Sequence, residues 1–177
     1  MSRFLLPVIF FILIIPIFII GLDRNKSELP SPLLNKDAPD YELTSLNHPD
    51  RLVGNDSYKN EMILLNVWAT WCIGCREEHQ FLMELSKRKT IPIYGLNWKD
   101  QRSDALRWLD QLGDPYVDTA FDRTGRVGID WGVYGAPETF LIGSTGKVLY
   151  KHISPLTEKI WQQEFIPRMK IEKENLQ

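Results

Sequence analysis

The sequence predicts one α/β domain, with a central mixed sheet flanked by helices, preceded by one transmembrane helix. Three observations support this prediction. Residues 4–22 are apolar and uncharged, the run 61–69 reads as a buried strand followed by a helical segment, and residues 139–153 read as two strands joined by a tight turn. A chain of 177 residues, of which 44% are hydrophobic, is long enough for one core and a short appendage.

The composition narrows the possible function classes. A formal net charge of −2 provides no basic surface for nucleic acid. Two cysteines cannot build the multi-disulfide framework of a small secreted domain. A structural zinc site on one Cys-x-x-Cys needs a second pair of ligands, and the three histidines, His48, His79 and His152, are scattered along the chain. We therefore expect no nucleic-acid partner and no resident metal.

The first segment, FLLPVIFFILIIPIFIIGL at residues 4–22, has the length that a helix needs to cross a bilayer. A cleaved signal peptide is the alternative, but the apolar run is long and no small-residue cleavage site follows it. Charges on both flanks leave the orientation open. We expect a signal anchor at residues 1–22, a polar, proline-containing linker at 23–36 and the globular domain at 37–177.

The first buried strand is expected at residues 61–69, EMILLNVWA, which are apolar almost throughout. It leads into the two cysteines, and the segment REEHQFLMELSKRK after them has helical spacing, with basic residues near its end as the helix dipole favours. The run IPIYGLNW at 91–98 reads as a second buried strand, and DALRWLDQL at 104–112 as a second helix with Ser103 or Asp100 as its N-cap.

The second half of the domain adds three strands and a final helix. A short strand is expected at 116–120, followed by an irregular glycine-containing stretch and by the hairpin at 139–153 with its Ser-Thr-Gly turn. The tail at 157–170 places four large apolar residues on one helical stripe that packs on the sheet, namely Ile160, Trp161, Phe165 and Met169. The order β-α-β-α-β-β-α, with the cysteines where the first strand meets its helix, is the thioredoxin-like arrangement.

The two cysteines lie three residues apart on the first turn of the expected helix, where their side chains share a face and can form a disulfide. Unpaired N–H groups at a helix N-terminus stabilise a thiolate, which is the attacking species in disulfide exchange. Cys72 is therefore predicted to be the nucleophile and Cys75 the resolving cysteine. A purely structural disulfide is the alternative, but closing so short a loop removes little chain entropy.

A second feature is the pair Ala136-Pro137, just before the expected hairpin. Thioredoxin-like proteins resemble one another in having a cis-proline here that faces the cysteine pair. By that likeness, Pro137 has a cis peptide bond, and the backbone of Ala136 pairs with an extended segment of a client protein. An ordinary trans-proline at the entrance of a strand is the alternative.

Three stretches together resemble a single family: LLNVWATWCIGCREEHQ at 64–80, LNWKDQRSDALRWL at 96–109 and GVYGAPETFLI at 132–142. The family is that of the membrane-anchored thiol:disulfide interchange proteins of bacterial cytochrome c maturation, called CcmG or DsbE. The resemblance covers nearly everything after Asp37. It implies a thioredoxin-like fold with an inserted segment and an N-terminal hairpin. The sequence YELTSL at 41–46 and residues 51–53 are the candidates for that hairpin.

The resemblance also implies a place and a task. The domain would face the periplasm on a single-pass inner-membrane anchor. It would act as a protein disulfide reductase that keeps the haem-attachment cysteines of apocytochrome c reduced, directly or through a partner thiol protein. Its electrons would come from a transmembrane thiol donor of the DsbD or CcdA type. Its redox centre would be the disulfide between Cys72 and Cys75, with no further cofactor.

By the same resemblance, family acids correspond to Glu78, three residues after Cys75, and to Glu138, next to Pro137. Negative charge near a thiolate raises the pKa of the thiol and favours the dithiol, which makes a protein reducing rather than oxidising. The alternatives are a solvated helix acid for Glu78 and an edge-strand carboxylate for Glu138.

The client groove is expected to be lined by Trp71, Tyr134 and Ala136, with a packing role as the alternative for Tyr134. The spacer between the cysteines departs from the family pattern. It is Ile73-Gly74, where the family usually has a proline. A proline in the first turn of a helix presets φ and a glycine loosens it, so the redox potential is left open.

Two other functions stay open at this point. A thioredoxin-fold copper chaperone would use both sulfurs and a histidine, for which His79 is nearest. His79 reads more simply as a helix-surface residue, and the cysteine spacing argues against that class. A broader TlpA-like or ResA-like reductase would keep the same chemistry but serve other clients, such as proteins that assemble copper sites.

Overall fold

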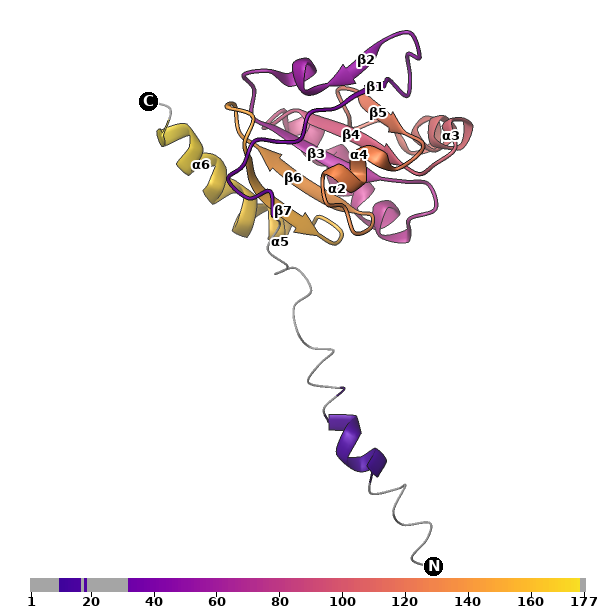
Figure 1. Ribbon diagram of the computed structural model, residues 1–177, viewed down its shortest axis with the longest axis vertical. Coiled ribbons are helices and arrows are strands. Elements are labelled where there is room, and N and C mark those ends of the chain that lie inside the picture. The colour runs from indigo at the N-terminus through magenta and orange to yellow at the C-terminus, as the bar shows by residue number, and fades with distance from the viewer. Residues whose placement is uncertain (1–9, 17, 19–31, 176–177) are drawn as a thin grey trace, which may run out of the picture.

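A five-stranded mixed sheet in the order β5-β4-β3-β6-β7 forms the centre of the domain (Figure 1). The computed structural model describes residues 10–16, 18 and 32–175. The strands are β3 (Ile63–Trp68), β4 (Ile93–Trp98), β5 (Thr119–Asp122), β6 (Glu138–Ile142) and β7 (Val148–Ile153). Strands β3, β4 and β5 are parallel, and β6 is antiparallel to both of its neighbours. The predicted mixed sheet is confirmed.

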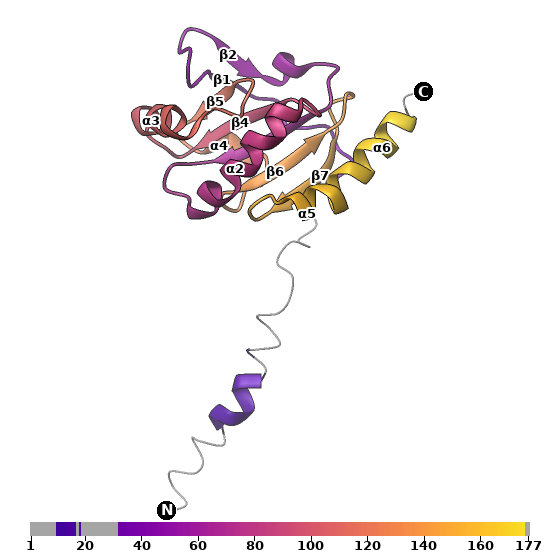
Figure 2. The same ribbon diagram turned by 180° about the vertical axis from the view of Figure 1, so that it is seen from behind.

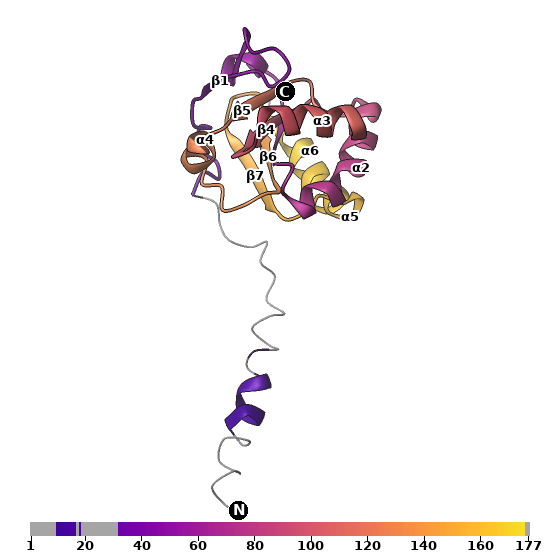
Figure 3. The same ribbon diagram turned by 90° about the vertical axis from the view of Figure 1, so that its right-hand side faces the viewer.

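Helices cover both faces of this sheet. They are α2 (Ile73–Arg88), α3 (Arg102–Leu112), α4 (Arg126–Asp130), α5 (Glu158–Ile160) and α6 (Ile166–Asn175), the last two joined by the π-helical turn η3 (Trp161–Phe165). Figure 2 looks onto α2 and the C-terminal helices. Figure 3 shows α2, α3 and α6 on one side of the sheet and α4 on the other. The predicted arrangement, a sheet flanked by helices, is therefore confirmed.

Strand β3 is buried over its whole length, as its apolar sequence predicts. Side chains alternate between the two faces of a strand. Leu64 and Trp68 belong to the core under α2 and α3, so Asn66 between them faces the same way. Ile63, Leu65 and Val67 belong to the core on the opposite face. This alternation places one polar side chain of the central strand beneath the helix that bears the cysteines.

The N-terminal part of the domain runs along the outer strands. Strands β1 (Glu42–Thr44) and β2 (Leu52–Gly54) form an antiparallel hairpin, as predicted, and the short 3-10 helix η2 (Asn55–Tyr58) follows. Ser45 bridges Ala120 of β5, and Asp37 bridges Lys147 at the start of β7. The same stretch of chain thus contacts both edges of the sheet.

Three local predictions need correction. Strand β5 begins at Thr119 rather than Tyr116, because Tyr116 turns its side chain into the core and bonds Asn66. The irregular stretch after β5 contains the short helix α4. Helix α3 is capped by Gln101 rather than by Ser103 or Asp100, and its cap makes no side-chain hydrogen bond.

The C-terminal tail packs as predicted. Trp161, Phe165 and Met169 are buried in the core under the helices, and Ile160 packs against it. The π-helical turn η3 widens the helix by one residue at this point and keeps Trp161 and Phe165 stacked, with ring centroids 5.6 Å apart. The tail is therefore part of the same core as the cysteines.

Within residues 10–16, 18 and 32–175, no helix is both long enough and apolar enough to cross a membrane. Residues 10–16 are helical. The predicted transmembrane segment at 4–22 and the linker at 23–36 lie mostly outside the described residues, so the anchor and the domain boundaries stay predictions.

Candidate active site

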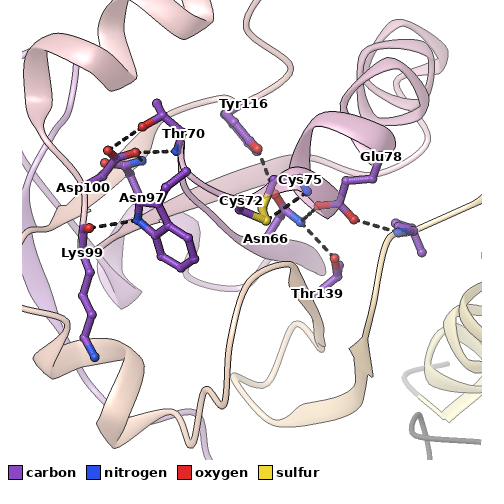
Figure 4. The surroundings of a disulfide bond; sticks show 12 residues. Asn66, Thr70, Cys72, Cys75, Glu78, Asn97, Lys99, Asp100, Tyr116 and Thr139 are labelled. Carbon is purple, nitrogen blue, oxygen red and sulfur yellow. Dashed lines mark hydrogen bonds between the residues drawn. A yellow bond between two sulfur atoms is a disulfide. The ribbon is translucent and has the colours of Figure 1, made fainter. Parts of the chain in front are cut away.

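The two cysteines form a disulfide bond where α2 begins (Figure 4). Cys72 is the N-cap of the helix, and its sulfur accepts a hydrogen bond from the backbone N–H of Cys75, with 3.0 Å between the atoms. This N–H and the helix dipole both favour negative charge on that sulfur after reduction. Cys72 exposes 6% of its surface and Cys75 exposes 2%. Of the two, Cys72 is therefore the more open to an approaching client sulfur.

Exposed apolar side chains surround the disulfide. Trp71 and Ile73, on either side of Cys72, are 53% and 79% exposed, and Tyr134 is 62% exposed. Ala136 is half-buried. Large apolar side chains exposed to solvent around a reactive centre are typical of a surface that binds another chain.

Asp100 holds the turn that leads into Cys72. Its carboxylate accepts hydrogen bonds from the backbone N–H of Thr70 at 2.6 Å and from the Thr70 hydroxyl at 2.7 Å. The indole N–H of Trp71 donates to the carbonyl oxygen of Lys99 at 3.0 Å (Figure 4). Lys99 and Asp100 follow β4, the parallel neighbour of β3, so the ends of two adjacent strands meet here. Sequence reasoning missed this role, although polar residues directly after a buried strand were a usable signal.

Glu78 lies one turn beyond Cys75 on α2 and is only 1% exposed. Its carboxyl oxygens accept hydrogen bonds from the backbone N–H of Leu156 at 2.7 Å and from the side-chain amide of Asn66 at 2.8 Å. Burial raises the pKa of Glu78 from 4.5 to about 8, although both donors act in the opposite direction. The solvated-acid alternative is therefore wrong, and this carboxyl group exchanges its proton near neutral pH.

Asn66 connects Glu78 to the rest of the core. Its amide N–H groups donate to Glu78 and, at 3.1 Å, to the Thr139 hydroxyl, and its carbonyl accepts from the Tyr116 hydroxyl at 2.8 Å (Figure 4). Sequence reasoning did not single out these residues. The signal was present, because an asparagine in a fully buried strand needs hydrogen-bond partners and a polar site supplies them.

We expect Glu78→Gln to remove a pH dependence of stability. The pKa of Glu78 is about 8 in the folded chain against an ordinary value of 4.5, so between these values the folded protein holds a proton that the unfolded chain has released. The stability from this protonated group is complete below about pH 4.5 and is lost as the pH rises through about 8. At about 1.4 kcal/mol per pKa unit, the loss is up to about 5 kcal/mol.

Urea unfolding of the oxidised protein over a range of pH measures this effect. Relative to wild type, Glu78→Gln should gain stability steadily between about pH 5 and about pH 9. The control is Glu77→Gln, which changes the exposed neighbouring glutamate and should follow the wild-type curve. Parallel curves for Glu78→Gln and wild type would contradict the raised pKa.

The loop before β6 comes close to the cysteine spacer. The Ala136–Pro137 peptide bond is cis. A β-carbon added to Gly74 would lie 2.9 Å from Cδ of Pro137 and 3.1 Å from Cγ of Pro155. The glycine therefore fits a site that two prolines close, and a side chain at this position would require them to shift.

Glu138 lies on the other face of the sheet. It pairs with Val67, whose side chain packs in the core opposite α2, whereas the neighbouring pair Asn66 and Thr139 faces the helix. Its carboxylate forms an ion pair with Lys151 at 3.0 Å, and both side chains are almost completely buried. The edge-strand alternative is therefore wrong, and Glu138 does not face the helix that carries the cysteines.

The Glu138–Lys151 pair fixes the loop that carries Tyr134. Glu138 accepts the backbone N–H of Tyr134 at 2.9 Å, and the Lys151 ammonium donates to the carbonyl oxygen of Gly132 at 2.8 Å. The ammonium also lies over the Tyr134 ring, 4.4 Å from its centroid. Lys151 was missed from the sequence, because a lysine in a hairpin is usually solvated.

His79 is buried rather than on the helix surface. It is 4% exposed, one ring nitrogen lies 3.1 Å from the carbonyl oxygen of Gly113, and the ring packs edge-on against Trp108. Burial lowers its pKa. In the part of the chain that the structure describes, no three histidine, cysteine or acidic side chains are grouped so as to hold a metal ion.

Comparison with known proteins extends these observations. The Redoxin family profile matches residues 33–164. A thiol:disulfide interchange protein DsbE from Allochromatium vinosum is 38% identical over 166 residues, which cover 94% of this chain and 92% of that protein. The DsbE of Escherichia coli is 42% identical over 169 residues, which cover 92% of this chain and 91% of that protein. The chain is a redoxin of the DsbE family.

The solved structures agree with the fold of a DsbE protein. A DsbF homologue from Corynebacterium diphtheriae superposes with a TM-score of 0.67 at 18% identity, over 84% of this chain and 94% of that one. A secreted thiol-disulfide isomerase from Corynebacterium glutamicum gives 0.63 at 20% identity, over 75% and 85%. The predicted family and the thioredoxin-like fold are confirmed. As a DsbE protein, the chain is a thiol-disulfide oxidoreductase that acts on thiol partners, with Cys72 and Cys75 as its Cys-x-x-Cys pair.

Proposed function

We propose that this DsbE protein is a membrane-anchored periplasmic reductant in cytochrome c biogenesis. Its task is to keep the haem-attachment cysteines of apocytochrome c, or those of a partner thiol protein, in the dithiol form. The observation that carries the proposal is Glu78, a buried carboxyl group one turn beyond Cys75. With a pKa of about 8, this group is partly ionised near neutral pH. Its negative charge, when present beside a thiolate, favours the protonated dithiol, and hence a reducing rather than an oxidising pair.

The reaction begins on the reduced protein. The Cys72 thiolate attacks one sulfur of a client disulfide, so that a mixed disulfide forms and one client thiolate leaves. The Glu78 carboxylate accepts the proton of the Cys75 thiol. The Cys75 thiolate then attacks the Cys72 sulfur, which forms the internal disulfide and releases the second client thiolate. Two electrons pass to the client, and the proton on Glu78 returns to solvent.

The client binds to the exposed apolar surface next to the disulfide. Trp71 and Tyr134 provide exposed aromatic surface, and the backbone of Ala136 pairs with an extended client segment. Lys151 and Glu138 hold the loop with Tyr134 in place through their hydrogen bonds to its backbone. Pro137 lies between this loop and β6, and its ring occupies the space next to Gly74.

The pair must be reduced again after each cycle. A transmembrane thiol donor of the DsbD or CcdA type supplies the two electrons by the same exchange in reverse. The anchor at residues 1–22 keeps the domain at the inner membrane, next to that donor and to the client. No cofactor besides the Cys72–Cys75 disulfide takes part.

Equilibration with glutathione or dithiothreitol couples, followed by thiol trapping, tests the reducing function. We expect a potential between about −200 and −270 mV. A second arm uses peptides: an oxidised Cys-x-x-Cys-His peptide that mimics a haem-attachment site, and a control peptide in which alanine replaces the histidine. A potential near that of a strong periplasmic oxidant, about −120 mV, would contradict the proposal. Equal rates for both peptides would argue for a broader range of clients.

A further inference from the structure

A chain of hydrogen bonds runs from a loop tyrosine to the buried carboxyl group. Tyr116 lies just before β5, its hydroxyl donates to Oδ1 of Asn66 at 2.8 Å, and Nδ2 of Asn66 donates to Oε1 of Glu78 at 2.8 Å (Figure 4). The second N–H of the same amide donates to Thr139 at 3.1 Å. In this orientation, every polar atom of the Asn66 side chain has a partner.

The orientation of the amide matters for Glu78. With Nδ2 toward the carboxyl group, Asn66 stabilises the ionised form. If the amide turned over, its oxygen would face an oxygen of Glu78 and would favour the protonated form. In the observed orientation, the Tyr116 hydroxyl donates to the amide oxygen, which draws electron density toward that oxygen and makes the N–H facing Glu78 a stronger donor. Burial raises the pKa of Tyr116 well above its usual value, so the hydroxyl keeps the proton that it donates.

Among the groups around Glu78, the side chains of Asn66 and Tyr116 are the ones that can stabilise its ionised form in this way. The groups that face it are Asn66 from β3, the Leu156 backbone after β7, Tyr116 from the loop before β5 and the cysteines on its own helix. Among residues 32–175 it has no ion-pair partner. Of these groups, Tyr116 and, after reduction, the two cysteines can titrate.

We propose that Asn66 and Tyr116 are positioning residues for Glu78, which hold an amide N–H against its carboxylate and so keep the proton-accepting form available beside Cys75. This role deepens the proposed function and rests on it, because it matters for exchange only if Glu78 takes the proton of Cys75. Neither residue touches the client. Tyr116 acts on Glu78 indirectly, through the amide of Asn66. It lies in the loop before β5, outside the βα unit that carries Asn66 and Glu78.

The test is an NMR titration of the full chain in its oxidised form, labelled on the glutamate carboxyl carbons. The resonance of Glu78 is the one that disappears in Glu78→Gln, and its midpoint should lie near pH 8 in the wild type. Tyr116→Phe removes one hydroxyl and should move the midpoint up by about half to one pH unit, because a hydrogen bond of ordinary strength is lost from the chain. Asn66→Leu removes the donor itself and should move it further.

The matched control is Tyr94→Phe. Tyr94 is also a buried tyrosine next to the sheet, but its hydroxyl donates to the Ser57 carbonyl on the opposite face. The midpoint of Glu78 in Tyr94→Phe should equal that of the wild type. An unchanged or lowered midpoint in Tyr116→Phe would overturn the proposal, and so would an equal shift in Tyr94→Phe, which would show general loosening of the core. Because Tyr116→Phe is the smallest change, the test does not depend on whether Asn66→Leu folds.

The pH profile of disulfide exchange separates this proposal from the function on which it rests. If the rate profile of Tyr116→Phe moves together with the NMR midpoint, both proposals are supported. If the NMR midpoint moves and the rate profile stays in place, the positioning of Glu78 is supported and its part in proton transfer is refuted.

Discussion

Replacing Cys72 with serine should reduce the rate of client reduction by at least about a thousandfold. A hydroxyl group at this position cannot form the mixed disulfide that starts the exchange. Cys75→Ser should behave differently, because the Cys72 thiolate can still attack, and the mixed disulfide then has no resolving sulfur. We expect a covalent adduct between Cys72 and the client to accumulate. Rates with an oxidised peptide and non-reducing electrophoresis measure both outcomes.

The two variants control for each other, since each removes one sulfur and leaves the rest of the site intact. The asymmetry follows from the structure, in which Cys72 caps the helix and exposes more surface than Cys75. If adducts accumulated with Cys72→Ser instead, Cys75 would be the attacking residue. Equal loss of both activities without any adduct would show that neither sulfur reaches the client alone.

Lys151→Met should destabilise the protein by about 3–5 kcal/mol. The methionine leaves the Glu138 carboxylate buried without its cation, and the ammonium contact to the Gly132 carbonyl is lost as well. Adding Glu138→Gln should restore at least half of the lost stability. The amide can still accept the Tyr134 N–H, and no uncompensated charge is left in the core. Urea unfolding of both single variants and of the double variant measures the coupling.

Lys147→Met is the matched control, because Lys147 is an exposed lysine in the same β6–β7 hairpin and forms no ion pair in the described residues. It should change the stability by no more than about 0.5 kcal/mol. If Lys151→Met were as mild as this control, the buried pair would not contribute as the geometry indicates. A double variant no more stable than Lys151→Met would show that the ammonium acts mainly on the Gly132 carbonyl.

The sequence predicted the elements that apolar periodicity encodes. The run EMILLNVWA is β3 with both faces covered, and the stripe of Trp161, Phe165 and Met169 is the buried face of the final helix. Local patterns were less reliable where a side chain has a distant partner. Asp100 was one of two candidates for the cap of α3, but it holds Thr70 in the turn before Cys72. Nothing near Asp100 in the sequence points to a residue thirty positions earlier.

The residues of the site on α2 could be predicted from their spacing in the sequence, whereas those on β6 depend on the register of strand pairing. Cys72, Cys75 and Glu78 follow one another at helical intervals, so their shared face could be read from the sequence. Glu138 could not be placed in this way, because a shift of one residue in the pairing of β3 with β6 would turn it toward the cysteines. The observed pairing of Val67 with Glu138 puts it on the opposite face, where Lys151 neutralises it.

The contacts of residues 35–46 with the two outer strands have a consequence for the order of folding. Asp37 pairs with Lys147 and Asn35 with Val148, whereas Ser45 and Leu46 bond to the backbone of β5. The earliest part of the domain to be synthesised thus finds some of its partners only when the last hairpin is complete. Such long-range pairing closes slowly, and until it does the outer strand β7 keeps backbone groups unpaired. A nascent chain is therefore most exposed to strand pairing with its neighbours just before its own N-terminal segment docks.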